Sequence, residues 1–496
     1  MRNARILTLD DDDTEYMTSS IVVENGKIAA LGPGAEQGQA GAFDRIIEAE
    51  GCLAMPGLIN GHFHSPSAFM KGALEGMPLE LAMLYDVPWD GLAHSPRVYY
   101  LRAALSAIEM LKTGVTSVRD DAFFFGNPTK ETIDALFQAY LDCGMRTSIG
   151  FGINNVVEYE KLPYLKSFLS KAHLEAMERS ARLSTGDVMD LYRHAFERWH
   201  NGADGRLMVH ASCSAPQRVE LGLLQALSKL AVEHDVSYDL HILETKAQRV
   251  LGREKIGQSL VEYMHSAGVL TEHAIVIHAV WTTQRDIALM QQAGAVVAHN
   301  PVSNLRFGSG VMPYLKIREA GIPMCLGTDE ITNDESNNLW TTAKIGNLLQ
   351  KIATPEFEKW PSSGEYLNMM CAGGARALRR ATKVGALKRG YDADIILIDL
   401  NRCPFVPLNN LRTQLVHGET GSSVMLTMVR GEIVCERGRV LGVDEEAIKR
   451  EIRELWPKYR DECDQSNTQA RELAAAYQRT YERAAREDVG FSRWLS

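Results

Sequence analysis

The eight cysteines of this 496-residue chain are scattered and include no C-x-x-C pair. That absence argues against a thiolate zinc site and against a disulfide framework. It also excludes the zinc deaminases that combine an H-x-E motif with a P-C-x-x-C pair. We expect reduced, mostly buried thiols, as is typical of a cytoplasmic protein.

Long apolar runs and an excess of positive charge are also missing. No stretch approaches the roughly 18 consecutive apolar residues of a membrane span, and the N-terminal MRNARILTLDDDD has no apolar signal-peptide core. The formal net charge of −10 does not favour binding to nucleic acid or to an anionic membrane, both of which are negatively charged. The sequence therefore predicts a cytoplasmic protein that acts on a small molecule, with neither nucleic acid nor membrane as a partner.

Short β-forming segments occur near both ends of the chain, at residues 4–9, 20–24, 28–31, 394–399, 423–430 and 432–436. Asn25-Gly26 separates two of them and is a typical hairpin turn. The later segments follow one another without helical segments between them. We predict a small composite β-sandwich domain formed by residues 1–53 together with residues 386–443.

Between these ends, short apolar segments alternate with helical ones. The apolar segments after the first, which precedes His62, are 115–120, 146–152, 207–212, 237–243, 274–280, 295–300 and 322–329. The intervening segments, such as 98–111 and 282–292, place apolar residues with the spacing of a helix. Eight strands in β–α alternation predict a closed parallel barrel of the TIM type over residues 54–385.

Residues 444–496 are highly charged and predict a helical C-terminal extension. Ile448, Ile452, Leu455 and Trp456 recur at helical spacing and form one apolar stripe. The stripe packs either on its own subunit or against a second subunit, and the pattern leaves both alternatives open. We expect a homo-oligomer, a dimer or larger.

The segment PGLINGHFH places two imidazoles at the end of the first barrel strand. In a strand alternate side chains share a face, so His62 and His64 point the same way. Other polar groups follow later strands of the predicted barrel: His241, Glu244, His278 and Asp329. Because barrel enzymes work at the carboxyl ends of their strands, we expect these groups to meet there.

Imidazoles with one carboxylate suit Zn²⁺ or Fe²⁺ and leave a position for water, whose pKa such an ion lowers to about 7. A carboxylate must then take a proton and another group must protonate the departing atom. Glu244 follows the strand that holds His241, which suits it to the second task. The fourth strand segment contains no lysine that could be carboxylated to bridge two ions, so we predict a single divalent ion.

The motifs PGLINGHFH, LHILET, IHAVW, VAHNPVSNLRFGSG and LGTDE resemble those of the amidohydrolase superfamily. They are most similar to the branch of s-triazine hydrolases, guanine deaminase and S-adenosylhomocysteine deaminases. The stretch GALKRGYDADIILID resembles the end of that family's barrel. The resemblance implies a distorted TIM barrel with a composite β-domain and a mononuclear metal site.

The resemblance also implies roles for single residues. His62, His64, His241 and Asp329 would be the metal ligands. Asp329 would also accept the proton of the attacking water, and His278 would hydrogen-bond the attacking oxygen. Glu244 would carry the proton to a ring nitrogen and then to the departing amine.

The groups that would bind the substrate are less clearly marked. His210 matches a fourth-strand histidine that contacts substrate in the deaminases. The segment that follows the first strand, SPSAFMKGALEGMPLELAMLYDVPW, differs from the sequence usual in the family. The remaining candidates are Phe69, Met70, Trp89, Asp121, Asn304 and Glu330. His299 and Ser303 match the loop after the seventh strand, in a substrate or a purely structural role.

These features predict a metal-dependent aminohydrolase. It would attack an amino-bearing carbon of a nitrogen heterocycle and release ammonia or an amine. One alternative is hydrolysis of another bond, carbon–halogen, amide or ring C–N, at the same site. Another is a non-catalytic barrel scaffold, although all six metal and catalytic positions are filled.

Overall fold

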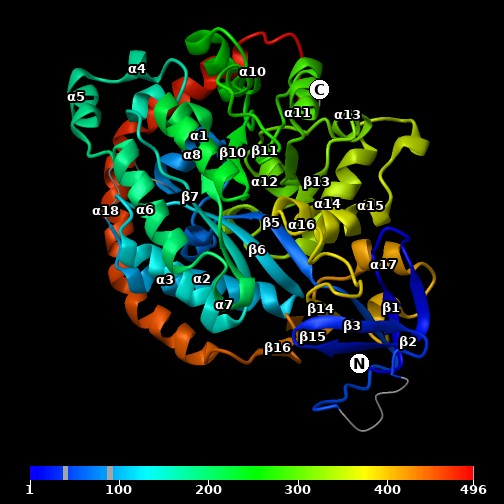
Figure 1. Ribbon diagram of the computed structural model, residues 1–496. Helices are drawn as coiled ribbons and strands as arrows, with labels where there is room; N and C mark the ends of the chain where they lie inside the picture. Colours follow the sequence, from blue (N-terminus) through cyan, green and yellow to red (C-terminus); the bar gives the residue numbers. More distant parts are fainter. Residues whose placement is uncertain (37–42, 87–92, 495–496) are drawn as a thin grey trace.

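Parallel strands form a barrel at the centre of the computed structural model, which describes residues 1–36, 43–86 and 93–494 (Figure 1). The strands are β5 (Leu58–Phe63), β6 (Val115–Ala122), β7 (Arg146–Phe151), β8 (Leu207–Val209), β9 (Ala211–Ser212), β10 (Tyr238–Ile242), β11 (Ala274–His278), β12 (Val296–His299) and β13 (Met324–Leu326). They pair in the orders β5-β6-β7-β8 and β9-β10-β11-β12-β13. Only His210 separates β8 from β9, and a bridge between Phe63 and Asp329 joins the outer strands. All eight predicted strand segments are present.

Helices follow the strands and cover the barrel on the outside (Figure 1). The longer ones are α2 (Pro96–Lys112), α3 (Lys130–Cys143), α6 (Thr185–Arg198), α8 (Leu221–Glu233), α11 (Gln284–Ala293) and α14 (Leu339–Lys351). Local chemistry sets their ends. For example, the Thr283 side chain accepts from the Asp286 backbone N–H at 3.2 Å, and Gly294 ends α11 with a φ of 71°.

Strands from both ends of the chain form one eight-stranded sheet beside the barrel. Its order is β17 (Arg439–Val440), β16 (Glu432–Glu436), β15 (Val424–Val429), β14 (Ile395–Asp399), β4 (Cys52–Pro56), β1 (Ala4–Leu7), β2 (Glu15–Glu24) and β3 (Lys27–Gly32). Asn25 and Gly26 form the tight turn between β2 and β3, with φ values of 50° and 77°. The chain passes from this sheet to the barrel at Gly57, where a Cβ would lie 2.2 Å from Thr116.

The C-terminal helix α18 (Glu445–Arg486) runs along the outside of the barrel, as the orange and red ribbon of Figure 1 shows. Ile448 and Tyr459 are buried in the main core, while Ile452 and Leu455 pack against its edge. Three of the four residues of the apolar stripe therefore pack on their own chain, while Trp456 is 37% exposed. No described helix combines the length and the hydropathy needed to cross a membrane.

Candidate metal centre

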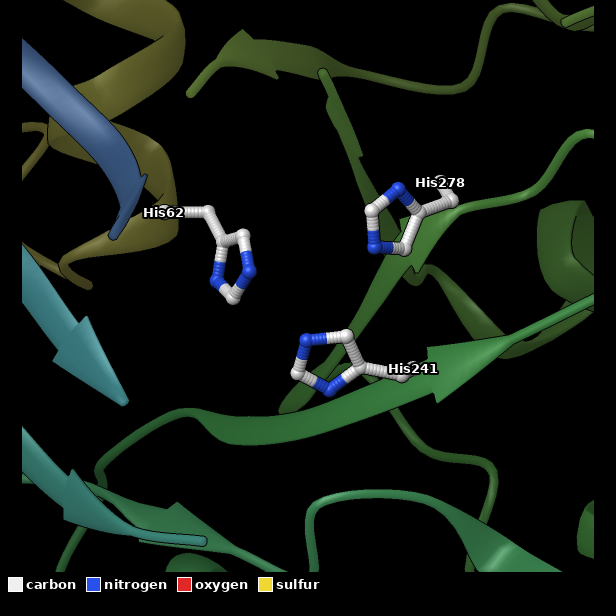
Figure 2. A group of neighbouring side chains, drawn as sticks. All are labelled: His62, His241 and His278. Carbon is white, nitrogen blue, oxygen red and sulfur yellow. The ribbon is translucent and has the colours of Figure 1, made fainter. Parts of the chain in front are cut away.

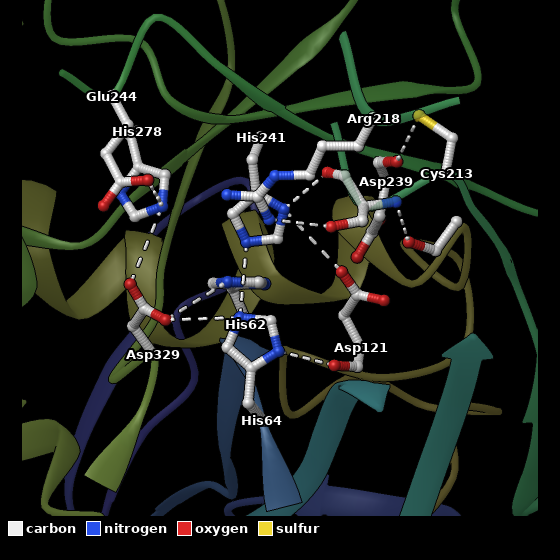
Figure 3. Close-up of polar contacts among 12 residues, drawn as sticks. His62, His64, Asp121, Cys213, Arg218, Asp239, His241, Glu244, His278 and Asp329 are labelled. Atoms are coloured by element: carbon white, nitrogen blue, oxygen red, sulfur yellow. Dashed lines mark hydrogen bonds and ion pairs between the residues drawn. The ribbon is translucent and has the colours of Figure 1, made fainter. Parts of the chain in front are cut away.

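Four side chains from three strands meet at the carboxyl end of the barrel (Figure 3). His62 lies on β5 and His64 just after it, His241 lies on β10, and Asp329 follows β13. The Nε2 atoms of His64 and His241 are 3.3 Å apart. Oδ1 of Asp329 lies 3.6 Å from His62 Nε2 and 3.4 Å from His64 Nε2. These groups are close enough to share one ion.

Backbone contacts fix which nitrogen of each imidazole faces the centre. His64 Nδ1 donates to the carbonyl of Asp121, and His241 Nδ1 donates to the carbonyl of Ser214 at 2.7 Å. The Nε2 atoms of both rings are thereby left as acceptors, which is how histidine ligands are usually oriented.

The ionisation of the cluster also suits a divalent ion. Burial and the neighbouring imidazoles hold the pKa of His241 well below its usual value, so this ring stays neutral. Burial alone would raise the pKa of Asp329, but its contact with His62 and the nearby imidazoles hold that pKa well below the usual range. His62 is fully buried and neither of its nitrogens has a hydrogen-bond partner among the described residues. Neutral imidazoles, a carboxylate and an unpartnered ring nitrogen together fit a divalent metal.

Glu244 and His278 lie beside the four ligand candidates. His278 Nε2 is 3.5 Å from Glu244 Oε2 and 3.6 Å from Asp329 Oδ2 (Figure 3). Figure 2 shows the His278 ring directed toward the rings of His62 and His241. Its Nδ1 donates to Asn304 Oδ1 at 3.0 Å.

These two groups have strongly shifted pKa values. Burial lowers the pKa of His278 to about 4, so the ring is neutral at pH 7. Burial, reinforced by the negative charge of Asp329, raises the pKa of Glu244 well above its usual value. The direction of this shift favours the protonated form of Glu244, which is the form that can donate a proton.

A sequence model of the amidohydrolase family matches residues 53–434, a span that contains all six of these groups. The chain belongs to the amidohydrolase family. This membership confirms the family that the sequence motifs resemble, and it makes the chain a hydrolase.

Curated relatives match almost the full chain. The 5'-deoxyadenosine deaminase of Methanosarcina acetivorans is 28% identical over 454 residues, which cover 91% of this chain and 96% of the relative. The 5-methylthioadenosine/S-adenosylhomocysteine deaminase of Thermococcus kodakarensis is 30% identical over 424 residues, covering 85% and 91%.

Solved structures share the fold of this amidohydrolase. Zinc-bound atrazine chlorohydrolase from Arthrobacter aurescens superposes with a TM-score of 0.81 at 24% identity, covering 92% of this chain and 99% of that one. A zinc-bound adenosine deaminase from Xanthomonas campestris gives a TM-score of 0.79 at 21% identity, covering 92% and 97%. The predicted distorted TIM barrel is confirmed.

A cavity of about 520 Å³, including its opening to solvent, lies against the metal centre of this amidohydrolase. Of the residues that the sequence suggested for substrate binding, Asp121 and Glu330 line it. Asn304 is fully buried behind it and holds His278.

Other suggested residues lie elsewhere. His210 is fully buried, and its Nε2 lies 3.2 Å from Asp239 Oδ2, outside the set of side chains that line the cavity. Phe69 and Met70 line a second cavity, formed with residues of α18. Trp89 lies outside the described residues. His299 and Ser303 are fully buried.

Several cavity residues were not suggested by the sequence. They are Leu79, Met83, Phe123, Gly152, Asn154, Ser214, Arg218 and Phe307. Arg218 follows the fourth strand in the stretch SCSAPQR, where a charged residue close to a strand end is a usable signal. The others carry no sequence signal, because apolar and small residues near strand ends are common in any barrel.

Proposed function

We propose that this protein is a metal-dependent aminohydrolase that acts on an amino-bearing carbon of a nitrogen heterocycle. The observation that carries the proposal is the position of Glu244, a buried carboxyl group 3.5 Å from His278 Nε2 and beside the four ligand candidates. A departing amino group needs a proton, because an amide anion is a very poor leaving group. The curated relatives at 28% and 30% identity are named deaminases, which agrees with this chemistry.

His62, His64, His241 and Asp329 would hold one divalent ion, Zn²⁺ or Fe²⁺. Such an ion lowers the pKa of water and so supplies a nucleophile at neutral pH. Water adds its oxygen to the heterocycle carbon, the C–N bond breaks, and ammonia or an amine leaves while the ring gains an oxo group.

The protein's own groups manage the protons. Asp329 Oδ2 faces His278 and would accept the proton released by the attacking water. His278, neutral and held through Nδ1 by Asn304, would hydrogen-bond the attacking oxygen through Nε2. Glu244 would donate its proton to a ring nitrogen and pass the second proton on to the departing nitrogen.

Ammonia release from purified, zinc-loaded protein tests the proposal, with aminopurines, aminopyrimidines, aminopterins and aminotriazines as substrates. Glu244→Gln should retain one metal ion per chain and lose about 10²–10⁴-fold in kcat, as expected for loss of a general acid. Glu254→Gln, a change at an exposed glutamate paired with Arg253, is the control. Full activity of Glu244→Gln would remove this residue from the mechanism.

Cleavage of a carbon–halogen bond, an amide or a ring C–N bond is the second candidate, because the same groups could activate water against any of them. Protonation of a ring nitrogen by Glu244 would assist loss of a halide as well, and only the second proton transfer, to the departing nitrogen, is specific to an amine. Release of chloride or of a ring-opened product in the same screen would support this second candidate. A cytoplasmic location and a homo-oligomeric state remain predictions from the sequence.

A further inference from the structure

The cavity also carries polar groups that the proposed mechanism does not use. In Figure 3, Asp121 lies on one side of His241, Glu244 and Asp329 lie on the other, and the Arg218 guanidinium overlaps the His241 ring in this view. Asp121 is the penultimate residue of β6, and Arg218 ends the short helix that follows β9. Both side chains line the metal-site cavity.

Asp121 is a carboxylate without hydrogen-bond donors. It is 1% exposed, and neither of its side-chain oxygens has a partner among the described residues. His241 Nδ1 lies 3.7 Å from Oδ2, but its N–H already donates to the Ser214 carbonyl. A buried carboxylate in this state costs free energy unless a donor reaches it, so it is an acceptor available to a ligand.

Arg218 is a hydrogen-bond donor, in contrast to the acceptor Asp121. Its guanidinium donates to Ser214 Oγ at 3.0 Å and to Met83 Sδ at 2.8 Å. A thioether sulfur is a weak acceptor, so a better acceptor on a ligand can replace it. The cavity therefore offers both a strong donor and a strong acceptor.

The charges around the cavity select against an anionic ligand. Four carboxyl groups line it, from Asp121, Glu244, Asp329 and Glu330, whereas Arg218 is the only lysine or arginine among the described lining residues. A divalent ion would offset part of this negative charge, but an added carboxylate or phosphate would meet like charges in a partly buried space. A neutral ligand avoids that cost.

We propose that Arg218 and Asp121 bind the lactam edge of an uncharged amino-heterocycle, with Arg218 donating to its oxo group and Asp121 accepting from the adjacent ring N–H. The inference rests on the proposed aminohydrolase function and narrows its substrate class. The amino-bearing carbon then points to the side of Glu244 and Asp329, where the chemistry takes place. Gly152 allows this approach, since a Cβ there would lie 3.3 Å from Asp121 Oδ1.

Binding of matched ligand pairs tests the assignment independently of turnover. The protein is zinc-loaded Glu244→Gln, and the pairs are cytosine against 4-aminopyrimidine and isoguanine against adenine. In each pair only the first ligand has an oxo group beside a ring N–H. We expect calorimetry to show at least a tenfold preference for the first ligand of one or both pairs.

Three further substitutions in the same background locate the origin of that preference. Arg218→Met and Asp121→Asn should each reduce it to threefold or less with zinc still bound at one per chain. Gly152→Ala should also reduce it, because the added methyl crowds Asp121 Oδ1 without changing any charge. Arg193→Met and Asp190→Asn, which alter an exposed ion pair on α6, are the matched controls and should leave the preference intact.

Three outcomes would overturn the assignment. One is the absence of a preference in both pairs. Another is an equal loss of affinity for both ligands of a pair in Asp121→Asn, which would show that this residue only orients His241. The third is tighter binding of 4-aminopyrimidine-2-carboxylate than of cytosine, which would show that Arg218 takes an anion. Ammonia release from other heterocycles would leave the proposed function standing even if the lactam subsite fails.

Discussion

Strained backbone marks the residues at the centre of the site. His278, Ala279 and Asp329 have φ values of 74°, 50° and 63°, in the left-handed region that side chains other than glycine seldom adopt. Such conformations cost about 1–3 kcal/mol each and persist where the surrounding structure enforces them. Here they turn His278 and Asp329 inward at the ends of their strands, toward the ring of His62.

At the same scale, we predict that His241→Ala loses metal and activity together. Removing a residue that only hydrogen-bonds to a metal ligand weakens metal binding by about 10–100-fold. Removing a ligand itself should therefore weaken metal binding more. Elemental analysis after dialysis would measure the metal content. His173→Ala, on the surface helix α5 (Lys171–Arg179), is the control. One tightly bound ion per chain in His241→Ala would refute its assignment as a ligand.

At the scale of elements, the contact between α18 and the barrel depends on a neutral histidine. The side chain of His94 is 5% exposed, with its ring 4.8 Å from that of Phe125 and 5.0 Å from that of Tyr459 on α18. Burial, together with the charge of Arg102, lowers the pKa of His94 to about 4, although Glu462 faces it at 3.8 Å.

Acidification should therefore loosen this contact. The folded pKa lies below the unfolded value of about 6.5, so the stability that a neutral His94 provides is complete above pH 6.5 and is lost as the pH falls toward 4. Between pH 7 and 5 the loss should reach about 2 kcal/mol. The protection factors of the α18 amides, which correct for the slower intrinsic exchange at acid pH, should fall less in His94→Gln than in the wild type over this range. An equal fall in both proteins would contradict the prediction.

At the scale of the whole molecule, a buried ion pair joins the barrel to the sheet built from both chain ends. Arg146, at the start of β7, donates to Asp394 Oδ2 through Nε and to Asp392 Oδ2 through Nη2, each at 2.9 Å. All three side chains are at most 5% exposed. The Arg430 backbone N–H also donates to Asp394 Oδ1 at 2.7 Å.

Arg146→Met should destabilise the protein by about 3–5 kcal/mol, because it removes the buried cation shared by two carboxylates and leaves Asp392 with Lys27, at 3.4 Å. Urea unfolding followed by circular dichroism would measure the change. Arg193→Met, which breaks an exposed ion pair, should stay within about 0.5 kcal/mol of the wild type. A similar effect of both substitutions would show that the Arg146 contact contributes little.

Local patterns in the sequence were enough to predict the eight barrel strands, the strands at both chain ends and the long C-terminal helix. Period-two and helical spacing, together with turn residues such as Asn25-Gly26, act over a few residues and need no partner. The six candidate metal and catalytic groups could be predicted because each lies at or just after the end of a predicted strand. Parallel strands bring their carboxyl ends to one side of a barrel, so these groups are expected to meet there. Their proximity in the structure agrees with that prediction.

Only the tertiary structure decided which side chains line the cavity. It placed Arg218 there and directed Phe69 and Met70 into a second cavity with α18. It also packed Ile448, Ile452 and Leu455 of the α18 stripe on their own chain and left Trp456 exposed. These outcomes depend on contacts between segments far apart in sequence, and local periodicity carries no information about which distant surface a side chain meets.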